Sequence, residues 1–330
     1  MITSSLVSIL SCCIAGVKEP PSNEQLISIM SENTESVLVI RHDRIEDASE
    51  GLKEFSQIWK SLAQEDWSGE EDPSLHTVVM HAAAASSPRV EIWGGSRFRR
   101  PVDLGLGDYE GRYLWIVADS LTPLRERITA DVDIEGDIEV IEHEGLEIFV
   151  GESRIVEYGN IDRIESTFVS MPDDNTLLMT ESIEEIKHML AAIKADDPSM
   201  PEQWAEVAQR TDLEVPILVL RSYDPTDKAS PYSPLNPHWG DKRVEIKSYS
   251  WAVQKSKDLT VRLVCDTPNP TKALAFLREA VVVPRLADAW RPAGGKVGLV
   301  GDFTISIDDE EDLSYFTIYV MVAFGFVIAI

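Results

Sequence analysis

The stretch from Glu165 to Lys194 constrains the fold more than any other part of the chain, because a strand, a turn, a second strand and a helix follow one another in it. In the first strand, Phe168 and Ser170 alternate with Val169 and Met171, so each pair would lie on one face. The turn-forming residues Pro-Asp-Asp-Asn come next. The apolar run from Leu177 to Met179 predicts the second strand. This pattern predicts a packing unit and indicates no chemistry.

The helix of this unit is predicted to begin after Ser182. Glu185 follows three residues later, which is the spacing at which a serine and a glutamate cap a helix start reciprocally. Four apolar residues fall on one helical face, namely Ile183, Ile186, Leu190 and Ile193. We expect this face to pack on a sheet that contains both strands.

The composition is that of a folded, strongly acidic protein. A chain of 330 residues with 44% hydrophobic and 26% charged residues can bury a core and has room for two domains. Its 57 acidic residues outnumber 30 basic ones, so the formal net charge is −27. Such a surface repels phosphate backbones, which argues against nucleic acid as a partner.

Two distant segments resemble each other. Val37 to Arg41 is an apolar strand closed by an arginine, and Val215 to Arg221 (VPILVLR) repeats that pattern. The repeat predicts two related units. The fold class we expect is α+β, with mostly antiparallel sheets and packed amphipathic helices. We place the first unit at residues 21–212 and the second at residues 213–312.

Further elements follow from periodicity and turn residues. We expect helices at Asp47 to Leu62 and Thr271 to Ala280, and strands at Thr77 to His81, Val90 to Phe98, Arg112 to Asp119, Val244 to Gln254 and Leu259 to Cys265. The glycines at 105, 107 and 111 are one residue off the dinucleotide-binding spacing and precede a strand, so we interpret them as a turn.

Both ends of the chain are apolar. Residues 2–17 resemble the hydrophobic part of a secretory signal that ends near a lipid-accepting cysteine, Cys12 or Cys13, although no basic residue precedes them. Residues 1–20 are therefore a possible signal or lipoprotein segment, with a short buried helix or a misplaced start as alternatives. Residues 313–330 are uncharged and fit either a membrane helix or a buried strand.

The acidic stretch from residue 131 to 142, DVDIEGDIEVIE, resembles the calcium loop of EF-hand proteins. That resemblance implies a metal site made of Asp131, Asp133, Glu135, Asp137, Glu139 and Glu142. The other interpretation is an amphipathic strand, with the acids facing solvent and Val132, Ile134, Ile138 and Val140 facing inward. We expect the strand and keep calcium as a possible ligand.

Arg41 and His42 directly follow a strand, which resembles the Arg-His-Gly phosphate site of histidine phosphatases. On that resemblance His42 would be the nucleophile, Arg41 would hold the phosphate, and His81 would be a second phosphate contact. However, Asp43 replaces the glycine and places a negative charge beside the phosphate. We expect these residues to be non-catalytic.

Arg97, Arg99 and Arg100, with Arg89 nearby, form the basic cluster of the chain. We expect them to pair with carboxylates of the same chain, with an anion site as the alternative.

The secretion-like start and the unit from Phe168 to Leu190 resemble uncharacterised bacterial cell-envelope proteins built from repeated α/β units. That resemblance implies a location in the cell envelope, with the cytoplasm as the alternative. We expect a protein without catalytic residues or a cofactor that binds or scaffolds. Its partner would be an unknown protein or small ligand, with membrane attachment possible. A calcium-binding module and a histidine-phosphatase-like hydrolase are the alternative functions.

Overall fold

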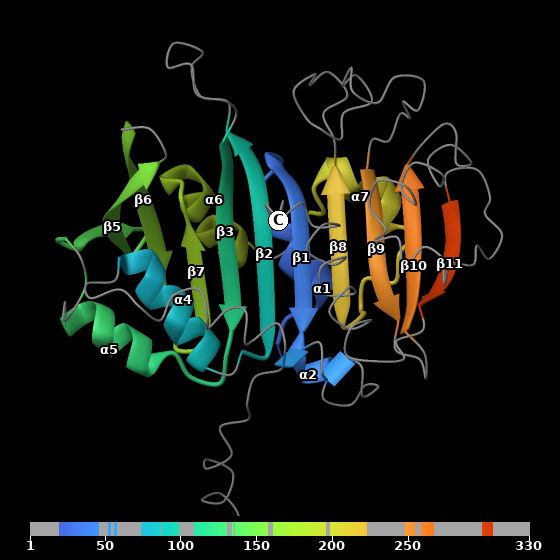
Figure 1. Ribbon diagram of the computed structural model, residues 1–330, viewed down its shortest axis with the longest axis horizontal. Helices are drawn as coiled ribbons and strands as arrows, with labels where there is room; N and C mark the ends of the chain where they lie inside the picture. The colour runs from blue at the N-terminus through green and yellow to red at the C-terminus, as the bar shows by residue number, and fades with distance from the viewer. Residues whose placement is uncertain are drawn as a thin grey trace, which may run out of the picture.

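Strand β1 (Thr34–Arg41) lies inside a single sheet of eleven strands that accounts for every strand the structure describes (Figure 1). The computed structural model describes residues 20–45, 52–53, 56–57, 74–86, 88–98, 109–130, 134, 136–157, 161–195, 199–222, 248–254, 259–266 and 299–305. The strand order is β11-β10-β9-β8-β1-β2-β3-β7-β6-β5-β4.

Every neighbouring pair in this sheet is antiparallel. The other strands are β2 (Val90–Phe98), β3 (Tyr109–Val117), β4 (Glu139–His143), β5 (Leu146–Glu157), β6 (Ile161–Ser170), β7 (Thr176–Thr180), β8 (Ile217–Ser222), β9 (Ser248–Gln254), β10 (Leu259–Asp266) and β11 (Leu299–Ile305). Together with the helices, they confirm the α+β class.

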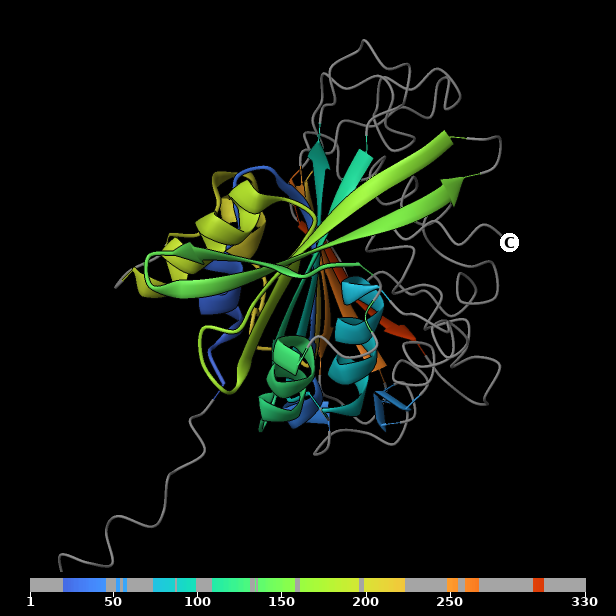
Figure 2. The ribbon, with the colours of Figure 1, turned by 90° about the vertical axis from the view of Figure 1, so that its left-hand side faces the viewer.

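Helices cover both faces of the sheet, as the edge-on view in Figure 2 shows. One face carries α1 (Asn23–Ser28), α6 (Ile183–Lys194) and α7 (Glu202–Ala208), and the other carries α4 (Leu75–Ala85) and α5 (Thr122–Ala130). The short helix α2 (His42–Ile45) follows β1 directly. No helix that the structure describes is both long and apolar enough to cross a membrane.

Each face has its own hydrophobic core, because successive side chains of a strand point to opposite faces. Val37, Val39 and Trp115 pack with the helices α1, α6 and α7, whereas Leu114 and Ile116 pack with α4 and α5. Neighbouring residues of one strand therefore belong to different cores.

The two similar strands found in the sequence lie side by side in the middle of the sheet. β1 and β8 pair antiparallel, and each is preceded in the chain by a helix and followed by a hairpin that extends the sheet outward. Arg221 pairs with Ser36, whereas Arg41 donates its backbone N–H to the Pro216 carbonyl. Since Arg41 lies an odd number of positions along β1 from Ser36, the partner of Arg221, the two arginines point to opposite faces.

The strand-turn-strand-helix unit has the predicted form. β6 pairs with β7, and α6 packs on the sheet with Ile186 and Leu190 buried and Ile183 partly buried. Ile193 departs from the prediction because it is 36% exposed.

The predicted reciprocal cap at Ser182 is only half formed. The Ser182 hydroxyl accepts the backbone N–H of Glu185, but the Glu185 carboxylate accepts the hydroxyl of Ser31 at 2.8 Å instead of reaching back. A complete capping box does occur at α1, between Ser22 and Gln25.

The predicted strand from Thr77 to His81 is wrong, since these residues lie inside helix α4. Ser74 caps the helix by accepting the N–H of Thr77, and Val78 and Val79 are buried on the sheet. The alanine run that follows has the highest helix propensity, and it outweighs the strand preference of the β-branched residues.

The predicted inward position of Val140 is also wrong, because Val140 is 53% exposed. The strand β4 is short and forms an edge of the sheet, and its neighbour Ile141 packs against the core instead.

Other sequence predictions lie outside the described residues. They concern residues 1–19, most of the helix at 47–62, the helix at 271–280, the glycines at 105 and 107, and the segment 313–330. The structure also leaves the domain boundaries at 212 and 312 as predictions.

Candidate functional site

A pocket of about 830 Å³ lies between the start of α1 and the end of α6, where β1 and β3 end and β7 begins. We call it the arginine pocket. It is lined by Pro20, Pro21, Ser22, Gln25, Ile29, Arg41, Asp43, Arg44, Arg89, Trp115, Asp173, Thr176, Ala192, Ile193 and Ala195. The exposure of Ile193 is explained by its position in this lining.

Arg41 forms a fixed wall of the pocket. Its Nε and Nη2 donate to the two carboxylate oxygens of Asp43 at 2.9 and 2.8 Å. Its Nη1 donates to the Pro21 carbonyl at 2.6 Å and to Asn23 Oδ1 at 3.3 Å. Because a guanidinium has about five N–H donors, Arg41 is nearly saturated and joins α1 to the end of β1.

Arg89 reaches the same pocket through strand pairing. Arg41 pairs with Val90 across β1 and β2, so Arg89 lies just beyond the end of the ladder. Its backbone is fixed, since its N–H donates to the Val117 carbonyl and its carbonyl accepts the N–H of Asp43. Its partly buried side chain forms no ion pair or hydrogen bond in the part of the chain that the structure describes.

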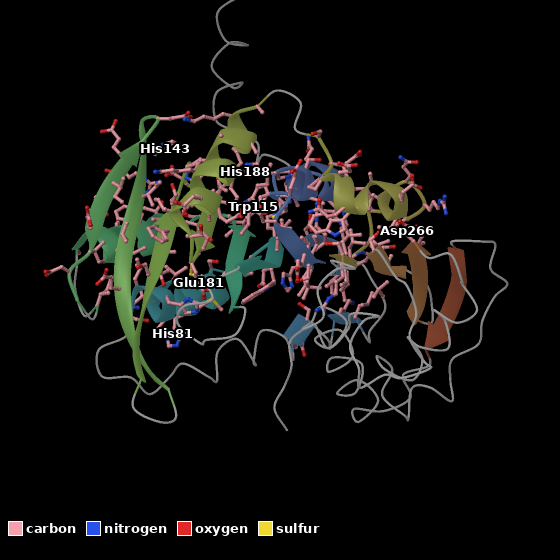
Figure 3. The ribbon with its side chains drawn as sticks, turned by 90° about the horizontal axis from the view of Figure 1, so that it is seen from above. His81, Trp115, His143, Glu181, His188 and Asp266 are labelled. Atoms are coloured by element: carbon pink, nitrogen blue, oxygen red, sulfur yellow. The ribbon has the colours of Figure 1, made fainter. Side chains whose placement is uncertain are left out.

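Trp115 lies beneath the pocket on the side of α1 and α6 (Figure 3). It is 3% exposed, and its buried Nε1 has no hydrogen-bond partner among the described residues. An indole N–H is only a donor, so a partner for it must be an acceptor. Thr176, at the start of β7, adds a hydroxyl to the same lining.

The charge of the lining is opposite to that of the whole protein. Three arginines face two aspartates in the pocket, although the chain has a net charge of −27. Asp43 is already paired with Arg41, and Arg44 pairs with Glu214 outside the lining. The arrangement can hold a carboxylate or a phosphate through Arg89 and the nearby donors.

His42 belongs to a different cluster on the other side of the sheet. Its Nδ1 lies 2.8 Å from Ser56 Oγ, and its Nε2 lies 3.3 Å from Glu91 Oε1 without hydrogen-bond geometry. Glu91 also accepts the indole N–H of Trp93 at 3.2 Å. In space, Ser56, His42 and Glu91 follow one another in the order of a serine-hydrolase triad. However, all three side chains are buried, since His42 is 3%, Glu91 5% and Ser56 8% exposed.

The three residues of the phosphatase hypothesis are therefore separated. Arg41 lines the arginine pocket, His42 is buried beside Ser56 and Glu91, and His81 lies on α4 over the opposite face (Figure 3). A histidine nucleophile has to reach the phosphate that the arginine holds. Neither histidine lines the arginine pocket.

The acidic stretch is only partly described. Asp131, Asp133 and Glu135 lie outside the described residues, Asp137 is exposed, and Glu139 and Glu142 are exposed on strand β4. Within the described ranges, no three His, Cys, Asp or Glu side chains are close enough to hold a metal ion. Calcium binding stays the untested alternative to the strand that we expect.

The basic cluster also remains a prediction in part. Arg99 and Arg100 lie outside the described residues, and the side chain of Arg97 is not described. Arg89 is the member of this cluster that the structure places in a pocket.

Sequence reasoning missed Arg44, Trp115 and Thr176. Arg44 follows Arg41 by three residues and could have been recognised as a second cation on the same turn. Trp115 and Thr176 meet the arginines only through strand pairing, which no local pattern shows.

Comparisons with protein-family models, with curated proteins and with solved structures find no match to this chain.

Proposed function

We propose that this protein is a non-catalytic binding protein of the bacterial cell envelope that holds a small anionic ligand in the arginine pocket. The observation that carries the proposal is Arg89, whose side chain lines the pocket without an acidic partner among the described residues. In a protein with almost twice as many acidic as basic residues, an arginine of this kind is available for an external anion.

The surrounding groups support the same ligand class. The Nε1 of Trp115 is buried and unsatisfied within the described part, and a buried donor of this kind is costly unless an acceptor is supplied. A ligand oxygen would supply that acceptor. Arg41 has a different role, since its bonds to Asp43 and Pro21 hold the pocket wall in place.

A volume of about 830 Å³ fits a small molecule rather than a bare ion. Ile29, Ala192 and Ile193 add an apolar side to the lining. The ligand class we propose is therefore an organic carboxylate or phosphate with a modest apolar part.

The test measures the thermal midpoint of the full chain in inorganic phosphate, in succinate and in sodium chloride of matched ionic strength. We expect phosphate or succinate to raise the midpoint more than chloride does. At about 100 times its dissociation constant, a ligand stabilises the folded state by about 2.7 kcal/mol.

Arg89→Gln should remove this rise, and Arg210→Gln is the matched control. Arg210 is an exposed arginine that pairs with Glu206 and does not line the pocket. A rise that is equal in chloride, or that survives in Arg89→Gln, would refute the anion site.

Two further measurements address the rest of the proposal. Hydrolysis of p-nitrophenyl phosphate that disappears in folded His42→Ala would favour the phosphatase alternative. Recovery of the tagged full-length protein from the cytosol alone would contradict the envelope location without affecting the pocket.

A further inference from the structure

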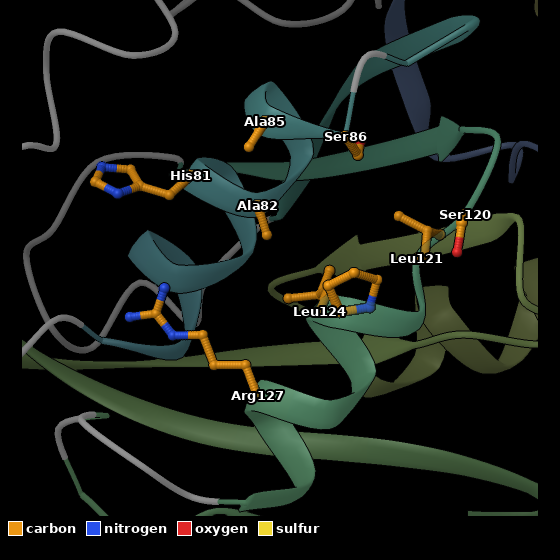
Figure 4. A pocket seen from close by; sticks show the side chains of 9 residues that line it. His81, Ala82, Ala85, Ser86, Ser120, Leu121, Leu124 and Arg127 are labelled. Atoms are coloured by element: carbon orange, nitrogen blue, oxygen red, sulfur yellow. The ribbon is translucent and has the colours of Figure 1, made fainter.

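A second cavity, of about 530 Å³, lies on the opposite face of the sheet between α4 and α5 (Figure 4). We call it the α4–α5 groove. Its apolar part consists of Ala82, Ala85, Leu121, Pro123 and Leu124. None of these residues lines the arginine pocket, so the two sites are separate.

The groove forms because larger side chains of α4 and α5 pack on the sheet, whereas α4 presents small side chains to the space between the two helices. Val78 and Val79 hold α4 on the sheet, and Leu124 and Ile128 hold α5. Ala82 and Ala85 are three residues apart on α4, so both lie on the same helical face. Since methyl groups fill little of the space beside α5, an apolar channel is left.

The groove has two different polar ends. His81 and Arg127 lie at one end, where Arg127 extends from α5 toward α4 (Figure 4). Ser86 and Ser120 lie at the other end. The positive charge is therefore confined to one end of an otherwise uncharged lining.

The polar groups at the charged end are available. The Nε2 of His81 is buried and has no hydrogen-bond partner among the described residues. Arg127 is exposed and forms no ion pair or hydrogen bond in the part of the chain that the structure describes. Both can donate to an anion, and a guanidinium does so with two N–H groups at once.

We infer that the α4–α5 groove binds an amphiphile, with its carboxylate or phosphate head at Arg127 and His81 and its short unbranched alkyl chain along Ala82, Ala85 and Leu124. The alkyl chain would remove apolar surface of the groove from water, and the head would pair with the charged end. The volume is within the range of small-molecule sites.

Calorimetric titration of the full chain with octanoate, octyl phosphate, 1-octanol and acetate tests this inference. We expect octanoate or octyl phosphate to occupy one site per chain in the groove, in addition to any binding in the arginine pocket that Arg89→Gln removes. The tighter of the two identifies the head group. We expect 1-octanol to bind at least about tenfold more weakly, because its head carries no charge. Acetate should not displace the bound amphiphile from the groove, because it has no alkyl chain to bury.

Three variants locate the site. Arg127→Gln should weaken the better amphiphile by about twofold to fivefold, as expected for one exposed ionic contact. Ala85→Phe, at an exposed position of α4, should fill the groove and abolish binding. The control Arg210→Gln, at an exposed arginine outside both pockets, should leave the affinity unchanged.

The inference is overturned if neither amphiphile binds below about 1 mM, or if 1-octanol binds as tightly as octanoate. Unchanged binding in Ala85→Phe would place the ligand elsewhere and refute the groove. Loss of all binding in Arg89→Gln would assign the amphiphile to the arginine pocket instead. Because the two sites share no residue, failure here leaves the anion proposal intact.

Discussion

Gly151 on β5 allows helix α4 to approach the sheet closely, and Gly151→Ala should destabilise the protein. A methyl group added at this position would lie 2.6 Å from Cβ of Leu75 and 3.0 Å from its Cδ2. Leu75 begins α4 and is 2% exposed, so it is held inside the core. Ordinary van der Waals contact begins at 3.4 Å.

Two opposing effects set the size of the change. Replacing glycine by alanine at a compatible site stabilises a protein by about 0.4 to 1 kcal/mol, because the unfolded chain loses freedom. Overpacking a core costs about 1 to 3 kcal/mol. The Cβ of Leu75 is fixed to the helix backbone, so α4 and β5 must separate by about 0.8 Å before contact becomes ordinary. We expect the clash to win, with a net loss of about 1 to 2 kcal/mol.

Urea unfolding followed by tryptophan fluorescence measures this loss, and two backgrounds identify its cause. Leu75→Ala keeps the Cβ that clashes, so Gly151→Ala should remain costly there. Leu75→Gly removes that Cβ, and the cost of Gly151→Ala should fall below about 0.5 kcal/mol. An equal cost in all three backgrounds would refute the clash as the cause.

Four further predictions concern other parts of the fold. Leu190→Ala should lower the free energy of unfolding by about 2 to 5 kcal/mol, measured in urea, because Leu190 is 1% exposed in the core. Ser182→Ala should cost about 1 kcal/mol in the same assay, since α6 loses its N-cap. Millimolar calcium should raise the thermal midpoint no more than matched sodium chloride does, with or without Asp131→Asn or Glu142→Gln; a calcium-specific rise that both variants abolish would establish the metal site. His42→Ala should lower the thermal midpoint, because Ser56 and the Glu91 carboxylate lose a buried neighbour. The same variant should leave the rate of phosphomonoester hydrolysis unchanged.

The sequence was informative where the determining contacts are local. The turn after Met171, the cap at Ser182 and the spacing of Ile186 and Leu190 all act within a few residues, and all of them are present in the structure. The strands from Val90 and Leu259 were recognised for the same reason, because their own residues favour extended backbone.

Predictions failed where distant residues decide the outcome. The carboxylate of Glu185 bonds to Ser31, which lies 154 residues away, so the local capping signature was incomplete. Val140 follows an alternating pattern, but its strand is the edge of the sheet and lies beyond the core that buries its partner Phe149. Thr77 to His81 look like a strand by composition, but the cap at Ser74, the alanine run that follows and the burial of one face on the sheet make them helical.

The arginine pocket could not be predicted because its lining comes from segments that are separate in the chain. Arg41 and Arg89 were both noted in the sequence, yet only the pairing of Arg41 with Val90 shows that they share a site. Trp115 joins them because β3 pairs with β2. Antiparallel register is set by the whole sheet, so such constellations follow from topology and not from motifs.

The pairing of β1 with β8 also affects how the protein is made. Ser36 pairs with Arg221, so one edge of β1 waits for a partner 185 residues further along the chain. At ribosomal rates of about 5 to 20 residues per second, that wait lasts about 10 to 40 s. During this time the edge of an apolar strand is open to pairing with other chains.

A nascent chain that stops before β8 therefore carries an unprotected strand in what will become the middle of the sheet. Helix α7 and β8 emerge together, since only a few residues separate Ala208 from Ile217. Their arrival covers the edge and the adjoining core in one step. Early termination upstream of this point should yield aggregates rather than a smaller folded protein, and the yield of soluble protein depends on how well this interval is protected.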